Sequence, residues 1–122
     1  MIKRLEISGV HMHVDPKLFA YTTKKIGRLD RFVSRHARDS LHVEVLLKEE
    51  KLKARKNNVC EVIIHLPSAT INTKESTVNM FAAIDIVEAK LKNQLKKYKE
   101  THGSPHLHGR LISKLRRIKH QV

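Results

Sequence analysis

Three short segments in the middle of the chain alternate apolar and polar residues, which is the pattern of half-buried β-strands. They lie around Val43–Leu47, Val62–Leu66 and Ile71–Thr73. The connections between them, Glu49–Asn58 and Pro67–Ser68, are too short for a crossover helix, so consecutive strands are expected to pair antiparallel. This part of the chain is therefore predicted to form a meander whose first connection is highly charged.

A strand and a helix are predicted before the meander. Alternation indicates a strand that includes residues 5–7 and ends near Gly9. Asp15 and Pro16 then provide an N-cap followed by proline at the first helical position. The helix that begins there is expected to run to about His36.

A longer helix is predicted after the meander, from about Val78 to Glu100, with Ser76 or Thr77 as its cap. The order β-α-β-β-β-α predicts an α+β fold in which a four-stranded sheet carries both helices on one face. The second helix would face the core through residues three or four apart, namely Phe81, Ile84, Val87, Leu91, Leu95 and Tyr98. The opposite sheet face would be polar and meet water through His42, Glu44, Glu61, His65 and Asn72.

The first predicted helix separates its basic residues from its apolar ones. At about 100° per residue, one stripe carries only cations, namely Lys17, Lys24, Arg28, Arg31 and Arg35. A second stripe can face the core and contains Leu18, Thr22, Leu29 and Val33. In a chain of 122 residues with a net charge of +13, this arrangement indicates an anionic partner, for which nucleic-acid phosphate is the leading candidate.

Several functional classes are not expected from the sequence. No run of 18 apolar residues would span a membrane, and the N-terminus has no apolar signal core, so a cytoplasmic protein without membrane contact is predicted. Cys60 is the only cysteine, which excludes an internal disulfide and favours a small buried residue. The spacing of His102, His106 and His108 is a weak metal signal, and no catalytic motif is present. The protein is therefore not expected to be an enzyme, and it is expected to use neither a cofactor nor a metal.

The last part of the chain differs in composition from the rest. His102 to His106 contain glycine, serine and proline, a combination that interrupts the second helix. Basic residues but no acidic ones follow. Residues 1–100 are therefore predicted to form one domain, and residues 101–122 a basic C-terminal tail that is expected to be flexible.

The second predicted helix carries the segment Met80–Asp85, followed by Lys90-Leu91 and Gln94-Leu95, which together form a recognisable motif. The chain resembles the short form of the bacterial ribosome hibernation promoting factor and ribosome-associated inhibitor family. It differs from the common pattern at Asn79, where the family usually has Asp, and at Phe81, where it usually has Tyr. The matching segments cover about residues 2–100 and are Leu5–Gly9, Lys25, Arg28-Leu29, Leu47-Lys48, Glu50-Lys51, Val62–Pro67, Met80–Asp85, Lys90-Leu91 and Gln94-Leu95.

The resemblance implies a fold similar to that of double-stranded-RNA-binding domains and a function on the ribosome. A protein of this kind would bind rRNA in the mRNA and tRNA channel of the small ribosomal subunit. It would block translation there and store inactive ribosomes in stationary phase or under stress. The basic tail fits the hibernation promoting type better than the inhibitor type, which implies ribosome modulation factor as a further partner.

The candidate rRNA-binding residues come from two sources. The resemblance supplies the basic positions of the two helices and one lysine after the second strand, and the stripe geometry adds two more residues. From the resemblance come Lys25, Arg28, Arg31, Lys48, Lys90 and Lys97, and from the geometry Lys24 and Arg35. Two alternatives stay open, a general double-stranded-RNA-binding regulatory module and a regulatory protein that contacts a sigma factor.

Overall fold

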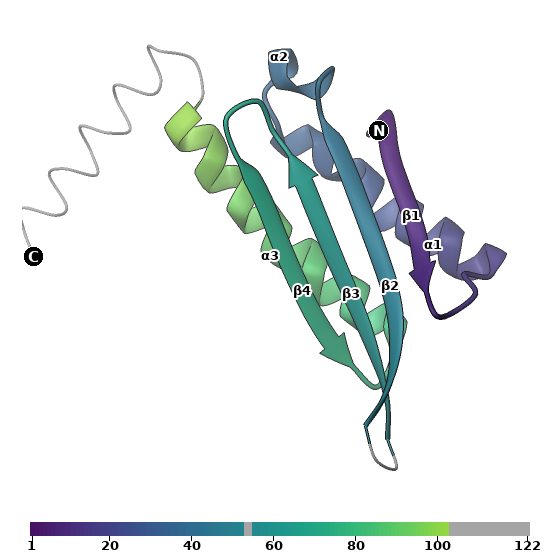
Figure 1. The fold of residues 1–122 in the computed structure, drawn as a ribbon. Helices are drawn as coiled ribbons and strands as arrows, with labels where there is room; N and C mark the ends of the chain where they lie inside the picture. The colour runs from purple at the N-terminus through teal and green to yellow at the C-terminus, as the bar shows by residue number, and fades with distance from the viewer. Residues whose placement is uncertain (53–54, 103–122) are drawn as a thin grey trace, which may run out of the picture.

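The computed structural model describes residues 1–52 and 55–102, which form a four-stranded sheet and a layer of helices (Figure 1). No helix in these ranges is long and apolar enough to cross a membrane. The elements in chain order are β1 (Arg4–Val10), α1 (Pro16–Gly27), the 3₁₀ helix η1 (Arg28–Phe32), α2 (Arg35–Arg38), β2 (His42–Leu52), β3 (Arg55–His65), β4 (Thr70–Thr77) and α3 (Met80–His102).

The strands lie in the order β1-β2-β3-β4. The pairs β2–β3 and β3–β4 are antiparallel, which confirms the predicted meander, and β1 pairs parallel to β2. A parallel pair needs a long crossover, which α1, η1 and α2 provide here. Both long helices lie on one face of the sheet, as predicted (Figure 1). The face turned away from α1 and α3 is called the open face below.

The core lies between the sheet and the helices, and it confirms the predicted apolar patterns. Alternate residues of β2 and β3 point into it, as does the central part of the predicted α3 stripe. The Cys60 thiol is also buried there, which raises its pKa to about 12. The fully buried side chains of these elements include Val43, Val45, Leu47, Val62, Ile64, Ile84, Val87, Leu91 and Leu95.

The prediction that Glu49–Asn58 is a charged connection was wrong for most of that segment. The ladder between β2 and β3 continues without a break, pairing Glu50 with Asn57 and Lys51 with Lys56. Period-two alternation arises only where one face of a strand is buried. This end of the hairpin extends past the helices (Figure 1), so polar residues occupy both of its faces and the signal is lost. Residues 53–54 lie outside the described ranges.

The first helix starts as predicted, because the Asp15 carboxylate accepts a hydrogen bond from the Leu18 amide at 2.8 Å. It does not run to His36, however. α1 ends at Gly27, η1 follows, and Val33 and Ser34 are extended before the single turn of α2. Glycine weakens a helix by about 1 kcal/mol relative to alanine, and the contacts of the next segment favour the break.

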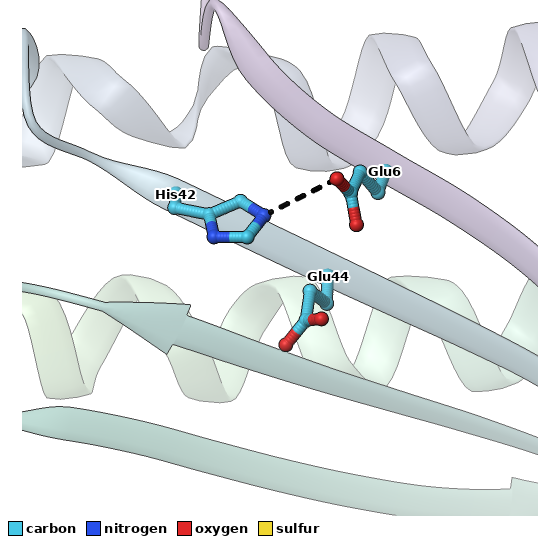
Figure 2. Close-up of side chains that lie close together, drawn as sticks. All are labelled: Glu6, His42 and Glu44. Atoms are coloured by element: carbon cyan, nitrogen blue, oxygen red, sulfur yellow. Dashed lines mark ion pairs between the residues drawn. The ribbon is translucent and has the colours of Figure 1, made fainter.

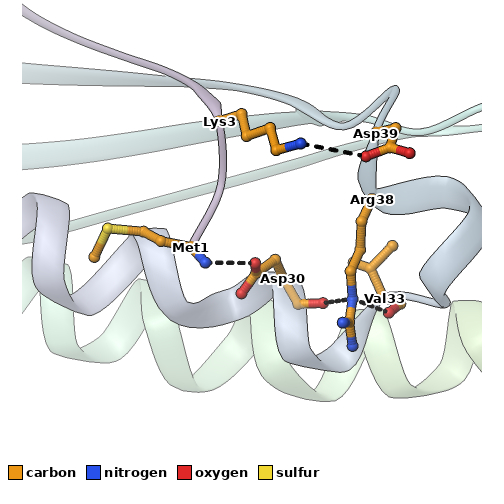
Figure 3. A network of polar contacts seen from close by, with 6 residues as sticks. All are labelled: Met1, Lys3, Asp30, Val33, Arg38 and Asp39. Atoms are coloured by element: carbon orange, nitrogen blue, oxygen red, sulfur yellow. Dashed lines mark hydrogen bonds and ion pairs between the residues drawn. The ribbon is translucent and has the colours of Figure 1, made fainter.

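Polar contacts around η1 fix this break in the helix (Figure 3). Arg38 Nε donates to the backbone oxygens of Asp30 and Val33, at 3.0 Å each. These carbonyls are thereby satisfied without a continuing helix. The Asp30 carboxylate lies 2.8 Å from the N-terminal amino group of Met1, which attaches the start of the chain to η1. Lys3 and Asp39 form an exposed ion pair at 3.6 Å beside this network.

The cap of the last helix also differs from the prediction. Ser76 and Thr77 belong to β4, and Asn79 caps α3 by accepting the Phe81 amide at 2.9 Å. At its other end α3 reaches His102, so two residues assigned to the tail are helical. The remainder of the predicted tail lies outside the described residues.

Gly9 allows the chain to turn tightly after β1. A Cβ atom at this position would overlap the backbone oxygen of Met12, which cannot move aside as a side chain would. Gly9→Ala is therefore expected to lower the free energy of unfolding by about 2 kcal/mol, within the usual range for overpacking. Gly27→Ala is the matched control, because its Cβ would meet only the flexible Met1 side chain at 3.0 Å and alanine favours the helix. Urea denaturation of both variants tests this, and equal stabilities would contradict it.

Candidate nucleic-acid interface

The five cations that were predicted to share one helical stripe do not lie on one continuous helix; they are Lys17, Lys24, Arg28, Arg31 and Arg35. Helix α1 turns every 3.6 residues, whereas η1 turns every three, so the common direction is lost after Gly27. The predicted single helical stripe is therefore wrong in its geometry. Lys24 and Lys25 lie in the last turn of α1, Arg28 and Arg31 in η1, Arg35 at the start of α2, Lys48 in β2, and Lys90 and Lys97 in α3.

Two of these residues are held by acidic side chains of α3. Lys25 Nζ lies 3.6 Å from Asp85 Oδ1, and Arg28 Nε lies 3.1 Å from Glu88 Oε2. Tyr21 donates a hydrogen bond to Asp85 at 2.5 Å, which raises the pKa of the phenol to about 12, with a further contribution from desolvation. These contacts attach α1 and η1 to α3 and compensate part of the positive charge.

Three other predicted residues lie in separate places. Lys90 forms an ion pair with Glu75 of β4, and Lys97 borders an open groove of about 420 Å³ between α3 and β4. Lys48 lies on the open face and pairs with Glu50 on its own strand at 3.3 Å. Because the sheet separates Lys48 from the helices, it cannot share one flat contact surface with the helical cations.

A different group of cations converges where η1 packs against α3. The Phe32 ring centroid lies 4.9 Å from Arg31 Cζ, 5.5 Å from Lys92 Nζ and 5.6 Å from Lys96 Nζ. These four residues are called the Phe32 cluster. Within residues 1–52 and 55–102, none of its three cations forms an ion pair with a carboxylate, unlike Lys25 or Arg28.

The buried packing of η1 determines this convergence. Leu29 and Val33 on either side of Phe32 are each 1% exposed, which fixes the segment against the core. Each cation gains roughly 0.5–1 kcal/mol from the face of an aromatic ring, but the three positive charges repel one another. An anion placed between them would relieve that repulsion, so the Phe32 cluster is suited to bind a phosphate group.

Sequence reasoning did not select Lys92 and Lys96 as site residues. In the structure they lie on the flank of α3 opposite Lys90 and Lys97. Their spacing of four residues and the aromatic residue next to Arg31 were visible in the sequence. What the sequence did not contain was the contact between η1 and α3, which brings these residues together.

Comparison with known proteins places the chain in a family. Residues 5–102 match the family model described as sigma 54 modulation protein / S30EA ribosomal protein. The ribosome hibernation promoting factor of Pseudomonas putida is 33% identical over 101 residues, which cover 83% of this chain and 91% of that protein.

Two solved structures have the same fold. A ribosomal subunit interface protein from Coxiella burnetii is 26% identical, with a TM-score of 0.64 over 79% of this chain and 97% of that one. The N-terminal domain of Protein Y from Thermus thermophilus is 28% identical, with a TM-score of 0.63 over 80% of this chain and 97% of that one. Sequence and fold agree: the chain belongs to the sigma 54 modulation protein / S30EA ribosomal protein family.

Proposed function

We propose that this protein is a ribosome hibernation factor of the cytoplasm that acts by binding and not by catalysis. It binds rRNA in the mRNA and tRNA channel of the small ribosomal subunit, blocks translation there and keeps ribosomes inactive in stationary phase or under stress. Membership of the family supports this function, as does the similarity to a protein named ribosome hibernation promoting factor.

The observation that carries the proposal is the Phe32 cluster. Its three cations converge without a carboxylate partner among the described residues, in a chain whose net charge is +13. Each rRNA phosphate that such cations neutralise releases condensed counterions, which favours binding at low salt. Aromatic residues make up only 4% of the chain, so shape and phosphate position contribute more to recognition than base stacking.

The ion pairs within the free protein indicate which predicted residues contribute most to the affinity for rRNA. Lys25, Arg28, Lys48 and Lys90 must first give up a carboxylate partner before they can bind a phosphate. Their net contribution to affinity is therefore smaller than that of cations without such a partner. In this proposal the Phe32 cluster contributes most, with Lys24, Arg35 and Lys97 as further contacts of the helical side.

Co-sedimentation with purified small ribosomal subunits tests the proposed function. The full chain is expected to sediment with the subunit, to be released steeply as salt is raised, and to inhibit translation in vitro at the same concentrations. A large excess of free duplex RNA is not expected to displace it. Displacement by the duplex would instead indicate a general double-stranded-RNA-binding module, and failure to sediment with the subunit would contradict the proposal.

A further inference from the structure

Side chains from β1 and β2 form a compact group of metal-ligating atoms on the open face (Figure 2). Glu6, His42 and Glu44 each offer one ligand atom, and these three atoms lie within 4.8 Å of one another. His42 Nε2 lies 3.6 Å from Glu6 Oε1. The group lies on the sheet face opposite to the Phe32 cluster, so the two sites are separate, and it shares this face with Lys48.

The register of the sheet brings the three residues together. Glu6 and Glu44 are direct partners in the parallel ladder between β1 and β2. His42 precedes Glu44 by two residues, so it lies on the same face of β2. Because all three residues belong to paired strands and not to loops, their backbone positions are fixed before any ligand arrives.

The donor set is suited to zinc. Zn²⁺ is bound by imidazole nitrogen and carboxylate oxygen at about 2.0–2.2 Å, in tetrahedral sites with three or four protein ligands. Such a site holds its ligand atoms about 3.4 Å apart, so this group needs only a small contraction. The three side chains are exposed or half-buried, which leaves them free to rotate by that amount and leaves water access to a fourth position.

A second histidine holds the group in place. His65 Nε2 lies 2.9 Å from Glu44 Oε2, which leaves the other oxygen of Glu44 available to a metal. The His65 ring also stacks on the His42 ring, with centroids 5.2 Å apart and an angle of 28° between the planes.

We propose that Glu6, His42 and Glu44 bind one Zn²⁺ ion and that His65 acts as a positioning residue for Glu44. The ion would connect the edge strand β1 to β2 and neutralise two carboxylates on the open face. In the sequence, only the histidines of the tail were spaced like metal ligands; the parallel pairing of β1 and β2 is what places Glu6 beside Glu44.

Calorimetric titration of the metal-free full chain with Zn²⁺ tests the site. The parent protein is expected to bind one Zn²⁺ ion per chain with high affinity. E6Q and H42Q are each expected to lower that affinity by about 100-fold or more. H65Q is expected to lower it by about 10- to 100-fold, as for other residues that orient metal ligands. H36Q is the matched control, because His36 is an exposed histidine of α2 and is expected to leave the affinity unchanged.

Two further measurements locate the ion without relying on the variants. In the parent protein, one equivalent of Zn²⁺ is expected to shift the amide signals of β1 and β2 in a nitrogen–proton correlation spectrum and to raise the thermal unfolding midpoint. The chain has nine histidines, so the spectrum must distinguish Zn²⁺ bound at the proposed site from Zn²⁺ bound to other histidines. Shifts confined to other residues, or parent-like affinity in both E6Q and H42Q, would overturn the proposal.

Discussion

Replacing both Arg31 and Lys96 by glutamate is expected to lower the affinity for small ribosomal subunits by about 100-fold at physiological salt. Both cations belong to the Phe32 cluster and contact its ring from different elements, η1 and α3. Neither has a carboxylate partner within the described part of the chain, so the substitution would remove the proposed phosphate contacts without breaking an internal ion pair. The new carboxylates would in addition repel the phosphates.

The salt dependence distinguishes this explanation from a general loss of charge. Each lost phosphate contact reduces the slope of log affinity against log salt by about one, so the double variant is expected to reduce it by about two. The matched control is Lys51→Glu with Lys74→Glu, which changes the net charge equally at exposed positions of β2 and β4 that have no ion pair within the described residues. Equal losses in the two double variants would show that net charge alone governs binding and that the Phe32 cluster is not the contact.

Leu91→Ala is expected to reduce the free energy of unfolding by about 3 kcal/mol, in the range measured for buried leucines. Leu91 is 0% exposed at the centre of the core stripe of α3, so its truncation leaves a cavity between α3 and the sheet. A domain of this size unfolds about 4–8 °C lower for each kcal/mol lost. The thermal midpoint is therefore expected to fall by more than about 12 °C.

Ile86→Ala provides the comparison on the same helix. Ile86 is 39% exposed, and alanine is the stronger helix former, so the change in stability is expected to stay within about 0.5 kcal/mol. Urea denaturation of both full-length variants, followed by circular dichroism, measures the difference. If Leu91→Ala were as stable as Ile86→Ala, α3 would not pack on the sheet in the way described here.

The fold was predictable from sequence wherever one face of an element is buried and the other is exposed. That condition gives Val43, Val45 and Leu47 their alternation and gives α3 its stripe, and both were predicted correctly. It fails at the far end of the β2–β3 hairpin, where neither face is covered. It also fails at Gly27, because Leu29 in η1 and Val33 just after it are each 1% exposed although the helix is not continuous.

The candidate site was less predictable, because its electrostatics depend on contacts between distant segments. The sequence shows that Arg28 is basic but not that Glu88, sixty residues further on, lies 3.1 Å away. It shows Phe32 beside Arg31 but not the lysines that α3 adds to the ring. Periodicity assigns each side chain to a face of its own element, and only the packing of two elements shows which faces meet.

The parallel pairing of β1 also determines how the chain must close on itself as it folds. Strands β2, β3 and β4 and helix α3 contact neighbours in sequence, whereas Arg4 of β1 meets His42 only after the chain between them has looped back. Closing a long loop costs more conformational entropy than closing a short one. The contacts of α1 and η1 with α3 offset that cost only once the whole crossover has docked. We therefore expect strand β1 and the crossover to gain their stability together, as one cooperative unit added to the meander and α3.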